Sequence, residues 1–138
     1  MGCVLRALGK QFHVDEFMVK SKLSPCAIFR KGELIGSGPK GKKHNRSGVN
    51  IEVSTASFDN LKRQIKDAIK FLIKSKTEIR KLAGAEGLDG PPELDFGIRK
   101  RDSFTQSDCF PSELITLAGG LGLSIRVSQY PIDDEEKT

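Results

Sequence analysis

The sequence predicts an α+β fold in which a mixed five-stranded sheet has a long helix packed on one face. Two observations lead to this prediction. Apolar residues recur with the helical period from Phe58 to Leu82, which is about seven turns. The segments before and after this stretch are short, alternate between apolar and polar residues or run apolar, and are separated by turn residues, as strands are.

The first half of the chain predicts three strands and one short helix. The strands are Cys3 to Lys10, Cys26 to Arg30 and Val49 to Ser54. The helix, from Val14 to Leu23, has acids in its first turn, lysines in its last turn and a proline just beyond its end. Charges placed in this way complement the helix dipole, and proline cannot continue the helix.

The second half predicts two further helices and two strands. The long helix from Phe58 to Leu82 has Ser57 available as its N-cap, and glycines follow its end. A strand from Glu93 to Lys100 directs Leu94, Phe96 and Ile98 to one face. A short helix from Pro111 to Ala118 and a strand from Leu123 to Tyr130 complete the predicted elements.

The predicted order is therefore β-α-β-β-α-β-α-β. Its first six elements follow the split β-α-β arrangement of ferredoxin-like folds, to which one helix and one strand are added. A length of 138 residues suits one domain. We expect residues 1–130 to form that domain and the acidic residues 131–138 to be a disordered tail.

The segment Gly36 to Lys43 (GSGPKGKK) resembles two phosphate-binding motifs in its glycine spacing. Such a loop works because it leads into a helix whose free N–H groups bind the anion. Here a basic, non-periodic stretch and then a strand follow, and Lys43 replaces the hydroxyl residue that would bind magnesium. The sequence therefore predicts a flexible basic hairpin connection from Gly36 to Gly48 and no cofactor.

Composition narrows the function classes further. No stretch approaches the roughly 18 apolar residues of a membrane span. The three cysteines are odd in number and widely spaced, which favours reduced thiols in the cytoplasm. The cysteines and the two histidines show no metal-ligand spacing and no nucleophile–base pattern. An enzyme is therefore not favoured. A hydrolase or transferase with an unrecognised site is the third hypothesis, after the two binding functions given below.

The charge is unevenly distributed. Residues 1–83 have 18 Lys/Arg against 7 Asp/Glu, whereas residues 84–138 have 5 against 11. Four lysines repeat every four residues on the long helix and so form one ridge, and four basic residues lie in the Gly-rich connection. The candidate partner-binding residues are Lys62, Lys66, Lys70 and Lys74 of the helix and Lys40, Lys42, Lys43 and Arg46 of the connection. A basic surface can bind nucleic acid or an acidic protein, and it can also be a solvated helix face.

The chain also resembles a known family. The residues that support this are VDEFMVKSKLSPCAIFRKGE in the first half, and FDNLKRQI, ELDFGI and FPSELITLAGGLGLSIRVSQY in the second. They resemble the small, mostly bacterial family called Domain of Unknown Function 4279, over roughly residues 3–130. The third strand departs from the pattern, since Asn50 and Ile51 stand where an aromatic residue is common. The resemblance implies a compact α+β domain and no particular activity.

We therefore expect a non-catalytic cytoplasmic domain that binds another macromolecule. The favoured partner is a protein with an acidic surface, by analogy with immunity or accessory proteins. The alternative is nucleic-acid binding through the helix ridge and the Gly-rich connection. The sequence leaves open whether the protein is a monomer or pairs two copies through an exposed sheet edge.

Overall fold

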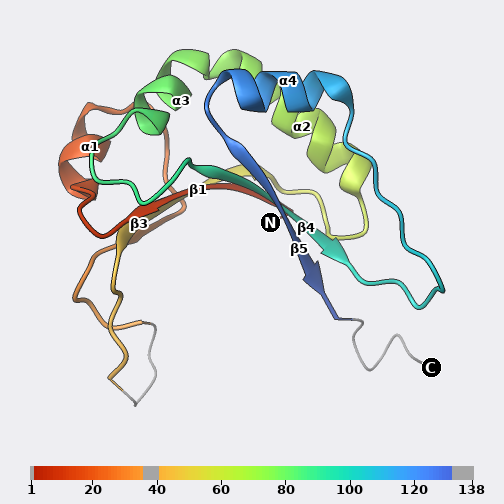
Figure 1. Cartoon of the computed structure of the whole chain (residues 1–138), viewed down its shortest axis with the longest axis horizontal. Coiled ribbons are helices and arrows are strands. Elements are labelled where there is room, and N and C mark those ends of the chain that lie inside the picture. The colour runs from red at the N-terminus through yellow and green to blue at the C-terminus, as the bar shows by residue number, and fades with distance from the viewer. Residues whose placement is uncertain (1, 36–40, 132–138) are drawn as a thin grey trace.

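A computed structural model describes residues 2–35 and 41–131 and shows the five predicted strands in one sheet (Figure 1). The strand order is β2-β3-β1-β4-β5, and each neighbouring pair is antiparallel except β4 and β5, which are parallel. The predicted mixed five-stranded α+β sheet is thus confirmed. The strands are β1 (Cys3–Gly9), β2 (Ala27–Phe29), β3 (Ser47–Ser54), β4 (Glu93–Arg99) and β5 (Ser124–Tyr130).

The connections form the predicted ferredoxin-like core. Strands β1 and β2 run parallel with β3 between them, and β3 and β4 run parallel with β1 between them. These are two split β-α-β units. The added helix then leads to β5, which pairs directly with β4. Strands β2 and β5 are the edges of the sheet, and β5 is the longer edge that a dimer paired through strands would use.

The four helices of the described residues lie on the same side of the sheet (Figure 1). A polar Asn or Ser can cap the orphan N–H groups that open a helix. The side chain of Asn60 accepts from the Arg63 N–H, so the long helix begins at Leu61 and Ser57 does not cap it. The helices are α1 (Val14–Lys20), α2 (Leu61–Lys74), α3 (Lys76–Ala83) and α4 (Ser112–Gly120).

The prediction of one continuous helix from Phe58 to Leu82 was wrong. Ser75 has φ −110° and ψ 22°, which separates α2 from α3. Serine favours a helix interior less than leucine and lysine do, so Ser75 is a locally weak position in the predicted helix. On both sides of this break the helices reach the core, since Leu72 of α2 and Ile79 of α3 are fully buried.

The core lies between the helices and one face of the sheet. Alternate residues of the central strands point into it, including Leu5 of β1 and the predicted Leu94, Phe96 and Ile98 of β4, which are all buried. The intervening residues point to the other face, and no described helix covers that face (Figure 1). We call it the open face. Side chains of all five strands therefore reach solvent there.

Candidate functional site

The four predicted lysines of α2 form the ridge that their spacing indicates. The buried residues of α2 are Gln64, Ala68 and Leu72. With a rotation of about 100° per residue, the lysines lie on the opposite side of the helix, and all four are exposed. Within the described residues none of them has a carboxylate within 4 Å. We call Lys62, Lys66, Lys70 and Lys74 the lysine ridge.

The basic residues of the Gly-rich connection lie elsewhere. Lys40 is outside the described residues, as are residues 36–39 and all of the predicted tail, residues 131–138, except its first residue. The described parts of the connection form the predicted hairpin, in which Leu34 pairs with Lys43 and the Ile35 N–H donates to the Lys42 carbonyl. This hairpin extends from the sheet away from the helices (Figure 1). The structure therefore does not join Lys42, Lys43 and Arg46 to the lysine ridge in one surface.

A hydrogen-bonded network that the sequence analysis did not identify crosses four strands of the open face. Arg6 of β1 donates from Nε to the Asn50 side chain of β3 at 3.1 Å, and from Nη1 to Asp95 of β4 at 3.1 Å. Ser128 of β5 donates to the second oxygen of Asp95 at 2.7 Å. Only 9% of the Asp95 side chain is exposed, so its charge is balanced by Arg6 in a largely desolvated position.

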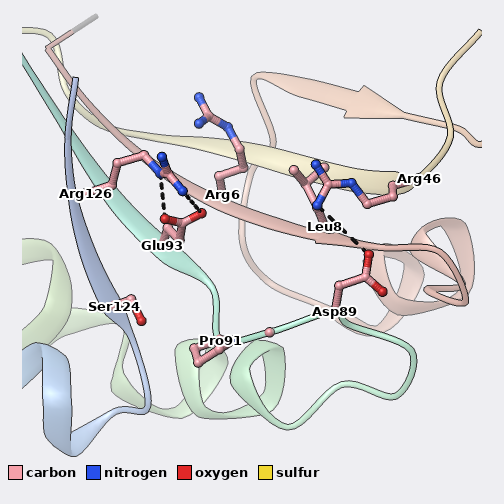
Figure 2. Close-up of a pocket in the computed structure, with 9 residues that line it drawn as sticks. Arg6, Leu8, Arg46, Asp89, Pro91, Glu93, Ser124 and Arg126 are labelled. Atoms are coloured by element: carbon pink, nitrogen blue, oxygen red, sulfur yellow. Dashed lines mark hydrogen bonds and ion pairs between the residues drawn. The ribbon is translucent and has the colours of Figure 1, made fainter. Parts of the chain in front are cut away.

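Beside this network lies a pocket of about 290 Å³ into which three arginines project (Figure 2). Arg126 of β5 donates to both carboxylate oxygens of Glu93, at 2.6 and 3.1 Å. This pairing raises the pKa of Arg126 above its usual value. Arg46 faces Asp89 at 3.9 Å, which is too long for a hydrogen bond. In Figure 2 the Arg6 side chain stands between these two ion pairs.

A second hollow, of about 310 Å³, lies next to this pocket. Three residues line both of them: Arg6, Leu8 and Arg46. The outer wall of the second hollow contains Phe29 of β2 and His44, whose rings lie 5.2 Å apart. The two hollows adjoin at these three shared residues, and we call them together the trough. Arginines line its middle, and an aromatic pair stands at one end.

The described residues contain no group of three or more His, Cys, Asp or Glu side chains that could hold a metal ion. No described helix has the length and apolar character that crossing a membrane requires. Burial raises the pKa of the Cys3 thiol strongly, with smaller contributions from Asp95 and Asp67. Cys26 and Cys109 are exposed, and in the described part of the chain neither thiol hydrogen-bonds to a histidine.

Comparison with known protein families decides where the chain belongs. The family model described as Domain of unknown function (DUF4279) matches residues 1–131. The chain belongs to this family. The resemblance seen in the sequence is thereby confirmed, and it now extends over nearly all of the 138 residues. No curated protein and no solved structure matches the chain.

In this DUF4279 chain the open-face network was not predictable from local pattern alone. Arg6, Asp95 and Arg126 alternate with apolar neighbours within their strands, so the pattern indicates that they share a face with other polar residues. Which of them meet depends on strand order and register, and the register places Val4 opposite Asp95 and Asp95 beside Arg126. Arg46 reaches the pocket from the hairpin, where no periodicity locates it.

Proposed function

We propose that this protein is a non-catalytic domain of the bacterial cytoplasm that binds another protein through the lysine ridge of α2. The partner presents an acidic surface and is of the kind that an immunity or accessory protein recognises. Three free cysteines agree with a reducing compartment.

The observation that carries the proposal is the lack of internal compensation at the ridge. Four lysines follow one another along one side of α2 at intervals of about 6 Å, and none has a carboxylate within 4 Å in the described residues. Like charges at this spacing cost a helix a few tenths of a kcal/mol per pair. An acidic partner neutralises the repulsion between the lysines and attracts the ridge, which also accelerates association.

Nucleic acid is the second candidate, and the ridge alone would have to bind it. The hairpin projects on the other side of the sheet from the ridge (Figure 1). The single basic surface of ridge and Gly-rich connection that was expected from the sequence therefore does not support nucleic-acid binding. Single-strand binders also stack bases on aromatic side chains. On α2 the one aromatic residue, Phe71, is half-buried and packs against the core.

The test is affinity capture from bacterial lysate, with and without nuclease. The variant Lys66→Glu plus Lys70→Glu reverses the centre of the ridge. The control, Lys10→Glu plus Lys20→Glu, makes the same change in net charge at exposed positions outside α2. We expect a nuclease-resistant protein partner that the control variant captures and the ridge variant loses at least tenfold.

Two results contradict the proposal. Capture that disappears with nuclease assigns the ridge to nucleic acid, and the affinity of that complex should fall steeply with salt. Equal capture by the ridge variant and the control removes the lysine ridge from the interaction. Thermal unfolding of both variants shows whether either substitution has changed the fold.

A further inference from the structure

We propose that the trough on the open face binds a small anionic ring compound. The carboxylate or phosphate group of the ligand lies among Arg6, Arg46 and Arg126, and its ring lies in the adjoining hollow beside Phe29 and His44. This site is independent of the lysine ridge, since the helices and the open face lie on opposite sides of the sheet (Figure 1).

The first support is a surplus of hydrogen-bond donors in the pocket. Each guanidinium has five N–H groups. Arg46 makes no hydrogen bond within the described residues, and Arg6 and Arg126 each use part of their donors, on Asn50 and Asp95 and on Glu93. A ligand that fits such a pocket supplies acceptors and negative charge. Carboxylates and phosphates do both, and they match the planar geometry of arginine.

The second support is that two of the three arginines are already held in place. Arg6 is fixed from both sides by Asn50 and Asp95, and Arg126 is fixed by its two bonds to Glu93. Both stand on strands of the sheet, which hold side chains more rigidly than loops do. Binding therefore costs little side-chain entropy at these positions.

Arg46 supplies the adjustable contact. Its 3.9 Å separation from Asp89 leaves no hydrogen bond to be broken when an anion arrives. Asp89 is itself held by the Lys10 backbone N–H, which donates to its Oδ1 at 3.2 Å. An incoming anion thus competes with Asp89 for Arg46. This predicts that neutralising Asp89 strengthens binding, whereas neutralising Arg46 weakens it.

The size of the trough limits the ligand. Pockets for whole small molecules begin at about 300 Å³. The first hollow, about 290 Å³, suits an acid group and the atoms next to it, and the second, about 310 Å³, leaves room for one ring system. The ring of Phe29 offers an apolar surface there, and aromatic pairs prefer offset or tilted contacts of the kind Phe29 and His44 already make.

The experiment titrates the full chain with four probes while ¹H–¹⁵N spectra follow the arginine side chains. Phenyl phosphate and benzoate carry the two acid groups on one ring, benzamide is the neutral counterpart, and inorganic phosphate lacks the ring. The variants are Arg46→Gln, Asp89→Asn and Phe29→Leu. Arg63→Gln, on the exposed side of α2, is the matched control.

We expect at least one ring anion to bind saturably with a Kd below about 1 mM and to shift the Arg6 and Arg46 signals, while benzamide does not. Arg46→Gln should weaken binding about tenfold, Asp89→Asn should strengthen it, and Arg63→Gln should leave it unchanged. Phe29→Leu should weaken binding of the ring anions and leave inorganic phosphate unaffected. The tighter of the two ring anions identifies the acid group.

The site is overturned if neither ring anion saturates, if benzamide binds as tightly as the tighter ring anion, or if Arg46→Gln leaves the affinity unchanged. Equal effects of Arg46→Gln and Arg63→Gln show attraction to net charge and overturn it as well. None of these results bears on the lysine ridge, so the two proposals fail separately.

Discussion

Arg6 and Asp95 are 89 positions apart in the sequence, yet Arg6 Nη1 lies 3.1 Å from Asp95 Oδ2 on the open face of the sheet. The pair joins β1 to β4, and Asn50 and Ser128 extend it to β3 and β5. Asp95 is almost completely buried, whereas about a third of the Arg6 side chain is exposed. The carboxylate therefore depends on Arg6 more than Arg6 depends on the carboxylate.

Removal of Arg6 should destabilise the protein. Arg6→Met leaves Asp95 as a buried charge without its cation, and we expect a loss of about 2 kcal/mol in the free energy of unfolding, since the exposure of Arg6 reduces the effect. Urea denaturation measures it. The double variant Arg6→Met with Asp95→Leu should lose less than the sum of the single losses. Strict additivity would show that the two side chains do not interact.

Cys3 should behave differently from the other two cysteines. A thiol reagent at pH 8 should modify the exposed Cys26 and Cys109 in the native protein and reach Cys3 only after unfolding. Mass spectrometry of the modified peptides measures the three rates. Cys3→Ser is the control, since it should leave the native reaction unchanged. Modification of Cys3 at the rate of Cys26 would contradict its burial.

The same thiol predicts a pH dependence of stability. Burial raises the pKa of Cys3 in the folded state, whereas an unfolded cysteine ionises near pH 8.5. Above that pH the unfolded state loses a proton that the folded state keeps, so stability falls as pH rises. Urea denaturation from pH 7 to 10 should show a steeper fall in the native chain than in Cys3→Ala. Parallel curves would contradict the raised pKa.

Gly97 should resist even a methyl group. A Cβ at this position would lie 2.6 Å from Phe58 Cε1 and 3.1 Å from Tyr130 Cε2. These two rings stack over Gly97 with their centroids 4.3 Å apart. Gly97→Ala should displace them and cost about 1–3 kcal/mol of stability. Tyr130 is the single tyrosine of a chain without tryptophan, so its fluorescence reports the displacement. Gly90→Ala, where a Cβ meets no atom within 4 Å, is the control.

Phe58 illustrates how local pattern and tertiary packing diverge. Its apolar character and spacing place it in the first turn of the predicted long helix, but Asn60 caps α2 two residues later. Phe58 packs instead on Gly97 and Tyr130. Helical periodicity does not distinguish a residue that begins a helix from one that packs just before it. Here the position of Phe58 depends on its packing against Gly97, which belongs to a strand distant in the sequence.

The sequence by itself determined the order of the elements, the residues of β4 that face the core and the side of α2 that the lysines occupy. Each of these depends on periodicity within one segment, because a strand repeats every two residues and a helix every 3.6. The tertiary structure decided the break at Ser75, the separation of the hairpin from the lysine ridge, and the meeting of Arg6 with Asp95. These depend on strand register and on burial between segments distant in the chain, and no local repeat encodes either.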